Sequence, residues 1–284
     1  NGNKDLFLKK GDKLKIYCPK FLNKEKNYLK LYPDSVFSSL EIDMKLRLDF
    51  NGAVVKIEKL FKEYAECICL NQGLLSSNKG VDILNKDINL DDFTEKDIQA
   101  IELCKRHNIK HIFISFCSSK EAVIRVKNLH SNSIITSKIE NILAINNLQE
   151  ILELSDNILI DRGDLSREIN IMDLPFAQRG IINQSHKNQT QCFVATNVLD
   201  SLLTSNLPTR AELNDIVSTI EMGASGIVLA AETAVGLKPL LCVEIVRELI
   251  HRFNLHKNGL LFADKDRNEI SDLGMKIWLN RTCY

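Results

Sequence analysis

The stretch SIITSKIENILAINNLQEILELSDNILIDRGDLSREI, residues 133–169, contains two apolar runs separated by a helical pattern. Between the runs, apolar residues recur at the helical period, at Leu148, Ile151 and Leu152, and the runs themselves have the length of buried strands. A strand, a helix and a second strand in this order predict two parallel strands joined by a covering helix.

The same alternation extends over most of the chain after residue 90. Five apolar runs, each followed by helical periodicity, occupy residues 111–116, 133–140, 157–162, 191–196 and 226–231. Such repeated units are typical of an open doubly wound sheet or of a (β/α)8 barrel. Neither Gly-x-Gly-x-x-Gly nor a Walker sequence occurs, so nucleotide binding in the manner of those motifs is unsupported.

The first part of the sequence has a different character. Short alternating segments dominate it. We expect the chain to turn at Gly11-Asp12, and Asn51-Gly52 is the strongest short signal for a hairpin. We therefore expect a small antiparallel β domain over residues 1–88, followed by the strand and helix units over residues 89–256. Residues 257–284 form a tail that no pattern assigns.

The composition limits which binding partners and which cellular compartment are expected for this protein. The chain of 284 residues has 37 Lys and Arg against 37 Asp and Glu, so no net charge draws it to nucleic acid or to an anionic membrane. No apolar run reaches the length of a membrane span, and the first residues resemble neither a signal peptide nor a natural start. The eight cysteines follow neither a metal-ligand nor a disulfide spacing, which predicts reduced, mostly buried thiols in an intracellular protein.

Charged side chains close the predicted strands. Lys138 and Glu140 lie two residues apart and so project from the same side of a strand, and Asp164 follows the next run. The carboxyl ends of parallel strands gather functional groups, and two carboxylates there could share one Mg2+ whose other positions are filled by water and phosphate. The lysine would neutralise negative charge on a phosphoryl group during its transfer. A solvated rim or a structural ion pair is the more frequent explanation of a Lys-x-Glu pattern alone.

Several segments resemble the pyruvate kinase family, and they occur in the family's order over roughly the first 250 residues. The segment at 133–169 is similar to the family's S-K-I-E-N and A-R-G-D-L-G-x-E-I stretches. The other similar segments are FVATNVLDSLLTSNLPTRAELNDI (193–216), GASGIVLAAETAVGLKPL (223–240), NKGVDI (78–83) and FTEKDI (93–98). The last two resemble the sequence around the return from the family's mobile lid domain.

The resemblance implies an α/β fold, in which a partial (β/α)8 TIM barrel of about five βα units follows a small antiparallel β lid domain. It also implies transfer of the phosphoryl group of phosphoenolpyruvate to ADP, which gives pyruvate and ATP in glycolysis. The corresponding expectation is a cytoplasmic homo-oligomer, a tetramer in the family, with an organellar location as the alternative.

Roles for individual residues also follow from the resemblance. Glu140 and Asp164 correspond to the ligands of Mg2+ or Mn2+, and Lys138 to the residue that stabilises the phosphoryl group in transfer. Gly163 and Asp164 lie where backbone N–H groups meet the substrate carboxylate, since the amino end of a helix suits an anion. Thr196 corresponds to a substrate-facing residue at the end of the site where enolpyruvate receives its proton.

The nucleotide and the monovalent cation complete the implied site. Lys79 would reach from the lid domain to the phosphates of ADP or ATP. K+ is a further implied cofactor, but the residues that bind it belong to the first three barrel strands, which this sequence does not contain. Because five strands cannot close a barrel, exposed strand edges and a tendency to associate are also expected.

The sequence departs from the family pattern within the site. Asp161 replaces the alanine before Arg-Gly-Asp, and an extra like charge about 5 Å from an anionic substrate costs on the order of 3 kcal/mol, roughly a hundredfold in binding. Ser166 replaces a glycine that tolerates positive φ. Asn197 replaces a glutamine, and Ala230 and Ala231 replace Ser-Gly, which changes the polar lining.

Two alternatives to an active pyruvate kinase follow from these differences. A catalytically impaired paralogue or fragment that acts only in subunit interaction is expected if the departures and the missing strands abolish activity. The other alternative is a different Mg2+-dependent barrel enzyme acting on phosphoenolpyruvate or pyruvate, such as a lyase. The lid-like segment before residues 93–98 argues against this second alternative.

Overall fold

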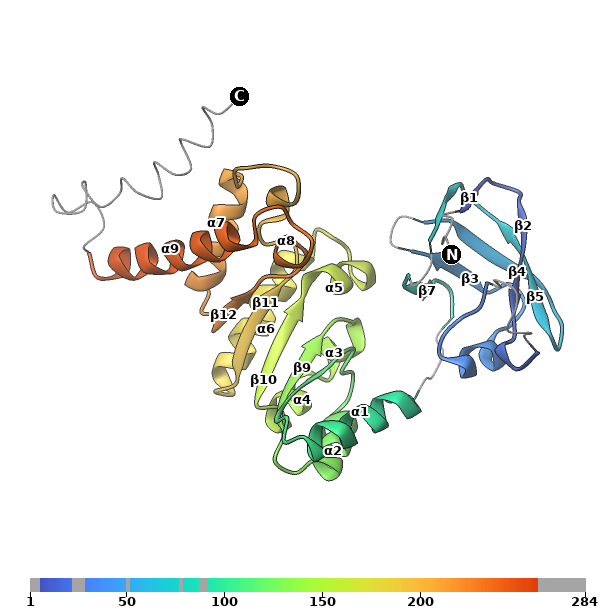
Figure 1. The fold of residues 1–284 in the computed structure, drawn as a ribbon, viewed down its shortest axis with the longest axis horizontal. Coiled ribbons are helices and arrows are strands. Elements are labelled where there is room, and N and C mark those ends of the chain that lie inside the picture. Colours follow the sequence, from blue (N-terminus) through green and yellow to red (C-terminus); the bar gives the residue numbers. More distant parts are fainter. Residues whose placement is uncertain (1–5, 22–28, 50–51, 77–78, 87–90, 260–284) are drawn as a thin grey trace. The chain divides into compact units, whose positions relative to one another are not determined.

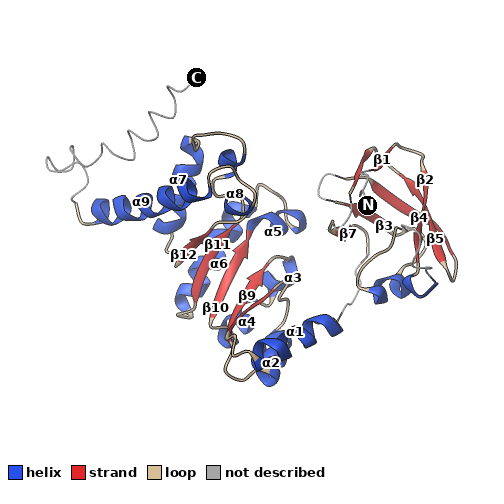
Figure 2. Ribbon diagram, viewed as in Figure 1, coloured by secondary structure: helices blue, strands red, loops and turns tan. Residues whose placement is uncertain are grey.

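A computed structural model describes residues 6–21, 29–49, 52–76, 79–86 and 91–259 of the chain. The chain divides into two compact units, residues 1–95 and residues 96–284. The ribbons of both units are drawn in Figures 1 and 2. Within the described ranges, every helix is too short or too polar to cross a bilayer.

The first unit is an antiparallel β domain. Its five-stranded sheet has the order β2-β5-β4-β3-β7, and β1 pairs separately with β6. The strands are β1 (Leu6–Leu8), β2 (Lys13–Tyr17), β3 (Lys45–Leu48), β4 (Val54–Leu60), β5 (Tyr64–Cys69), β6 (Gly73–Leu75) and β7 (Val81–Ile83), with 3-10 helices at η1 (Pro19–Phe21) and η2 (Asp34–Ser39). Alternate residues of β5 are buried, so Ala65, Cys67 and Cys69 face the core of this unit.

The strands beside the two predicted turns pair in different ways. The chain does turn at Gly11, where Asp12 N–H donates to the carbonyl of Lys9 at 3.0 Å. However, β1 and β2 do not pair with each other, since β1 pairs with β6 and β2 with β5. Around the second predicted turn, β3 and β4 do pair antiparallel, although Asn51 itself lies outside the described residues.

The second unit contains a five-stranded parallel sheet with the order β12-β11-β10-β9-β8. Its elements are α1 (Glu95–Arg106), β8 (His111–Ile114), α2 (Lys120–Leu129), β9 (Ile134–Ile139), α3 (Ile142–Asn146), α4 (Leu148–Leu154), β10 (Asn157–Asp161), α5 (Arg162–Glu168), α6 (Leu174–Lys187), β11 (Gln191–Ala195), η3 (Asp200–Leu203), α7 (Arg210–Glu221), β12 (Gly226–Val228), α8 (Ala231–Ala234) and α9 (Pro239–Lys257). Strands that are neighbours in the chain are neighbours in the sheet (Figure 2). The predicted fold, part of a (β/α)8 barrel together with an antiparallel β domain, is confirmed.

The two faces of the parallel sheet differ in chemistry. Ile139 and Ile160 are fully buried and are in register with each other, so they lie on one face. Because side chains alternate along a strand, Lys138 and Asp161 project from the other face. Lys138 is in register with Leu159 of the neighbouring strand. We refer to the side carrying Lys138, Leu159 and Asp161 as the Lys138 face.

Strands β8 and β12 form the two edges of the described sheet. On β8, Phe113 is in register with Thr136 and therefore belongs to the Lys138 face. Its side chain is 57% exposed, so this edge strand carries an uncovered apolar side chain. Association through these edges stays a prediction.

Most cysteines are buried, as the sequence predicts. Among the described residues, Cys104 is partly exposed and the others are buried free thiols. Burial raises the pKa of the Cys67 thiol to about 12 and that of the Cys192 thiol to about 12. Both thiols are therefore protonated at neutral pH and serve as small apolar side chains. Cys283 lies outside the described residues.

Candidate metal and substrate site at the carboxyl edge of the parallel sheet

Five predicted or suspected site residues converge at the carboxyl ends of three adjacent strands. Lys138 lies in β9 and Glu140 follows it directly, while Asp161 is the last residue of β10. Asp164 lies in the first turn of α5, and Thr196 follows β11. Parallel strands bring their ends to one edge, so residues far apart in the sequence meet here.

Three carboxylates form a cluster at this edge. Glu140, Asp161 and Asp164 each offer an oxygen atom, and these oxygens all lie within 4.8 Å of one another. Opposite oxygens in the shell of one Mg2+ are about 4.2 Å apart and those around Ca2+ about 5 Å apart. The cluster therefore has the dimensions of a site for a single divalent cation.

Glu140 is the deepest member of the cluster, with a side chain only 1% exposed. Its Oε2 accepts a hydrogen bond of 2.5 Å from the backbone N–H of Phe116. Its Oε1 is buried and has no hydrogen-bond partner among the described residues. A buried carboxylate oxygen needs a positive partner, and Glu140 shares its surroundings with two further carboxylates. This set of oxygen donors fits a divalent metal ion.

Lys138 is the ammonium beside this cluster. Its Nζ lies 2.5 Å from Glu140 Oε1 and 3.1 Å from Asp161 Oδ2. The first contact is an ion pair but not an aligned hydrogen bond, because Oε1 has no hydrogen-bond partner. Lys138 is thus held between two carboxylates, and the predicted proximity of Lys138 to Glu140 is found.

Burial and neighbouring charges shift the pKa values of both Lys138 and Glu140. Burial alone would lower the pKa of Lys138, but the contact with Glu140 and the charges of Glu140 and Asp161 outweigh it, so the pKa is raised. Burial raises the pKa of Glu140, although Lys138 and the Phe116 N–H act in the opposite direction. The lysine therefore stays charged at neutral pH, while the buried glutamate binds protons more readily than an exposed one.

The two aspartates respond differently to the same surroundings. Burial alone would raise the pKa of Asp161, but the hydrogen bond from Thr196 and the charge of Lys138 outweigh it and lower the pKa. For Asp164, burial and the charge of Asp161 raise the pKa despite the nearby Arg167. Asp161 is consequently a firmly ionised carboxylate inside the site.

These opposite shifts predict a pH dependence of stability for the metal-free protein. A raised folded pKa means that the stabilising contribution of Glu140 is complete below its unfolded pKa, about pH 4.3, and is lost as the pH rises through the folded pKa. Asp161 has the opposite sign, since its contribution is lost as the pH falls through its lowered pKa. Replacing Glu140 with glutamine should therefore stabilise the protein progressively more, relative to the parent, as the pH rises above about 4.3.

Urea unfolding of both proteins in the presence of a chelator, from pH 3 to pH 7, measures this difference. A difference in the free energy of unfolding that stays constant or shrinks with rising pH would contradict the burial argument for Glu140.

Thr196 is oriented toward the cluster by its backbone and by a neighbouring arginine. Its backbone has φ of 75°, in the left-handed region, and its Oγ1 donates a hydrogen bond of 2.5 Å to Asp161 Oδ1. Arg162 donates from Nε (3.1 Å) and Nη2 (2.7 Å) to the carbonyl of Thr196. Arg162 also pairs with Asp215 of α7, from Nη1 to Oδ2 at 2.6 Å. The arginine thus stabilises a left-handed turn that is uncommon for residues other than glycine.

Sequence reasoning missed two residues that shape the site. Arg162 belongs to the Arg-Gly-Asp stretch that the sequence singles out, so its position was visible but its contact with Thr196 was not. Phe116 follows β8 with φ of 50°, and this backbone conformation points its N–H at Glu140. No local pattern marks an aromatic residue for the left-handed region.

Gly163 packs closely against Thr196. A Cβ atom at this position would lie 2.7 Å from Thr196 Cγ2 and 3.5 Å from Asp161 Oδ1. The absence of a side chain at residue 163 therefore lets the start of α5 approach the turn after β11. This packing explains the glycine without any contact to a ligand, and its predicted role in binding the substrate carboxylate stays a prediction.

Replacing Gly163 with alanine is expected to lower the free energy of unfolding by about 1 to 3 kcal/mol, because the added methyl group overlaps Thr196. Gly180 offers a matched control, since it lies in α6 and a Cβ there meets nothing within 4 Å. The Gly180→Ala variant should be neutral or more stable by up to about 1 kcal/mol. Urea denaturation followed by circular dichroism tests both, and equal effects would contradict the packing argument.

The other departures from the family pattern have smaller consequences. Ser166 lies inside α5, and its Oγ donates to the carbonyl of Gly163 at 2.7 Å. The expected strain at this residue is not found, since Ser166 has no positive φ. Asn197 has φ of 54°, a conformation that asparagine tolerates well. Ala231 begins α8, and Ala230 N–H donates to the Glu232 carboxylate at 3.0 Å.

Lys79 belongs to the first unit. Its Nζ lies 3.7 Å from Asp49 Oδ2, and its side chain is about half exposed at 49%. Contact between Lys79 and a nucleotide stays a prediction.

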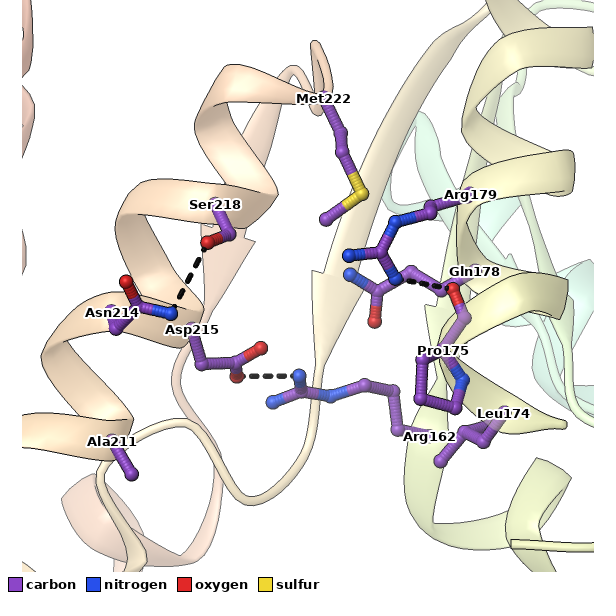
Figure 3. A pocket seen from close by; sticks show the side chains of 10 residues that line it. All are labelled: Arg162, Leu174, Pro175, Gln178, Arg179, Ala211, Asn214, Asp215, Ser218 and Met222. Atoms are coloured by element: carbon purple, nitrogen blue, oxygen red, sulfur yellow. Dashed lines mark hydrogen bonds and ion pairs between the residues drawn. The ribbon is translucent and has the colours of Figure 1, made fainter. Parts of the chain in front are cut away.

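A separate pocket of about 230 Å³ lies between α6 and α7 (Figure 3). It is lined by Arg162, Leu174, Pro175, Gln178, Arg179, Ala211, Asn214, Asp215, Ser218 and Met222. The ion pair between Arg162 and Asp215 crosses it, as Figure 3 shows. The same arginine donates a hydrogen bond to the carbonyl of Thr196. Arg162 therefore lines the pocket and also contacts the candidate site.

The fold and the site together define a class of protein: an α/β protein that combines part of a (β/α)8 barrel with an antiparallel β domain and has acidic residues at the carboxyl ends of its parallel strands. The family model described as "Pyruvate kinase, barrel domain" matches residues 1–243. The chain belongs to the pyruvate kinase family.

Individual relatives and solved structures agree with this assignment. The chain is 31% identical over 248 residues to a pyruvate kinase of Chlamydia muridarum, covering 86% of this chain and 52% of the relative. It is 32% identical over 214 residues to one of Thermococcus litoralis, covering 74% and 45%. A crystal structure of Cryptosporidium parvum pyruvate kinase shares the fold with a TM-score of 0.79 at 24% identity, covering 88% of this chain and 54% of that one. The chain thus spans about half the length of the curated relatives it matches.

Proposed function

We propose that this chain carries the part of a pyruvate kinase site at which the phosphoryl group of phosphoenolpyruvate passes to ADP, giving pyruvate and ATP in glycolysis. The observation that supports the proposal is the meeting of Lys138 with Glu140 and Asp161 beside Asp164 at one edge of the sheet. The substrates are inferred from family membership. The cluster contains the charged groups that phosphoryl transfer between them requires.

In this proposal Glu140 and Asp164 hold Mg2+ or Mn2+. When bound, such an ion neutralises charge on the phosphate oxygens. Lys138 contributes a positioned positive charge for the phosphoryl group in transfer, which suits a lysine whose raised pKa keeps it ionised. To reach that group, Lys138 must release at least one of its two carboxylate partners.

The remaining groups act on the organic part of the substrate and on the nucleotide. Backbone N–H groups of Gly163 and Asp164 would receive the carboxylate of phosphoenolpyruvate. Thr196 would serve the end of the site where enolpyruvate gains its proton, and its hydroxyl already makes a hydrogen bond to Asp161. Lys79 would contact the phosphates of ADP or ATP. K+ dependence, a homotetramer and a cytoplasmic or organellar location complete the proposal by family resemblance.

One observation favours a second candidate function, a catalytically impaired member that acts only in subunit interaction. Asp161 lies inside the site and is paired with Lys138 at 3.1 Å, and its lowered pKa keeps it ionised. It adds negative charge where an anionic substrate has to bind. Its ion pair also engages the Lys138 ammonium group that the phosphoryl transfer requires.

A coupled assay of ATP formation from phosphoenolpyruvate and ADP, in the presence of Mg2+ and K+, separates the two functions. The full-length gene product is compared with its Lys138→Met variant as the background. ATP formation clearly above that background supports the phosphotransferase. A signal equal to the background, from a protein whose thermal unfolding shows it to be folded, supports the impaired member.

A further inference from the structure

We propose that Asp161 is a third protein ligand of the divalent cation, so that this chain binds the cation before any phosphate-bearing substrate is present. The inference rests on the proposed metal site at Glu140 and Asp164 and deepens it. Two carboxylates leave most of the coordination shell to water and substrate phosphate, whereas three supply half of an octahedral shell from the protein itself.

Two independent features of the structure point to the ligand. The first is the position of the Asp161 carboxylate, which lies within 4.8 Å of the oxygens offered by both other acids. The second is Glu140 Oε1, a buried oxygen that makes no aligned hydrogen bond among the described residues and is met by the Lys138 ammonium as an ion pair. A cation within the cluster would coordinate this oxygen.

Hydrogen bonding assigns separate tasks to the two oxygens of Asp161. Its Oδ1 accepts the hydrogen bond from Thr196 Oγ1 at 2.5 Å, which fixes the rotation of the carboxylate. Its Oδ2 faces Lys138 Nζ at 3.1 Å, on the side of Glu140. Oδ2 is therefore the oxygen available to a metal ion, and Thr196 is a positioning residue for it.

Charge explains why the lysine and a divalent cation compete. Three carboxylates converge here, and the described positive groups in contact with them are Lys138 and Arg167, the latter 3.5 Å from Asp164. The Lys138 ammonium lies between Glu140 and Asp161, the two carboxylates that a shared cation would bridge. Cation binding should displace this ammonium from Glu140 Oε1 and leave it available to a phosphoryl group.

Binding of Mn2+ to the full chain without phosphoenolpyruvate tests the inference, with free Mn2+ followed by electron paramagnetic resonance. We expect one Mn2+ per chain. The Asp161→Asn variant keeps an acceptor for Thr196 and should bind Mn2+ at least about tenfold more weakly, since even residues that only support metal ligands change affinity ten- to a hundredfold. The Lys138→Met variant should bind more tightly, because the competing ammonium is gone.

Asp173 provides the matched control, since its carboxylate is exposed and makes no capping hydrogen bond at the start of α6. The Asp173→Asn variant should bind Mn2+ like the parent. Thermal unfolding of each variant establishes that it is folded.

The outcomes distinguish this inference from the proposed function. If Glu140→Gln and Asp164→Asn abolish Mn2+ binding while Asp161→Asn leaves it unchanged, Asp161 is no ligand and the metal site proposed from the family stands. If none of the three substitutions alters binding, both proposals fail. Weaker binding by Lys138→Met would overturn the competition between lysine and metal ion.

Discussion

Replacing Asp161 with alanine is expected to raise the affinity for phosphoenolpyruvate by roughly ten- to a hundredfold at saturating Mg2+. A carboxylate about 5 Å from an anionic substrate costs on the order of 3 kcal/mol at an effective dielectric near 20. The structure places Asp161 in the site. Burial acts in the opposite direction, but the hydrogen bond from Thr196 and the charge of Lys138 lower the pKa of Asp161, so the repulsion is expected at neutral pH. Its pairing with Lys138 offsets part of the repulsion, which sets the lower end of the range.

Titration of the full-length gene product with phosphoenolpyruvate, followed by intrinsic fluorescence at saturating Mg2+, measures the change. Saturating metal is essential, because the same substitution is expected to weaken the binding of the cation itself. Asp173→Ala serves as the control for removing one acidic side chain from the same unit. Unchanged or weaker substrate binding by Asp161→Ala would show that this carboxylate does not oppose the substrate.

Replacing Lys138 with methionine is expected to lower kcat for ATP formation by at least about a hundredfold, the scale found when one preorganised group that stabilises developing charge is removed. Methionine keeps most of the unbranched side chain and removes its charge. Because the lysine acts on the group in transfer, kcat should fall more than the KM for phosphoenolpyruvate rises.

Lys120 allows a matched comparison. It also pairs with a glutamate, Glu150, at 3.0 Å, but it lies on α2 with its side chain 41% exposed. The Lys120→Met variant should retain the parent rate. Equal losses in the two variants, or a Lys138→Met enzyme that is fully active, would remove Lys138 from the reaction.

The parallel half of the fold could be predicted from the sequence because its signals are strong and local. Apolar runs of strand length alternate with helical periodicity, and this pattern has few solutions. The convergence of Lys138, Glu140 and Asp164 follows from the same topology, since carboxyl ends of parallel strands share an edge. Recognition of these positions needed no knowledge of side-chain contacts.

The structural features that were not predicted from the sequence depend on contacts between distant segments or on the local backbone conformation. The turn at Gly11 was predicted, but the sequence did not indicate that β1 pairs with β6 and β2 with β5. The effect of Ser166 depended on whether its backbone is helical, which the sequence of α5 alone left open. The orientation of Asp161 required the positions of Thr196 and Lys138, both remote in the sequence.

The register of the parallel strands has a consequence for how this site can evolve. Lys138 lies opposite Leu159, and Asp161 lies opposite Ala195. Inserting or deleting a single residue within β9 or β10 would turn the following residues of that strand, Lys138 or Asp161 among them, to the opposite face of the sheet. Mutations that preserve this cluster are therefore expected to be substitutions and not insertions or deletions. The aspartate at position 161, where the family pattern has alanine, is such a substitution.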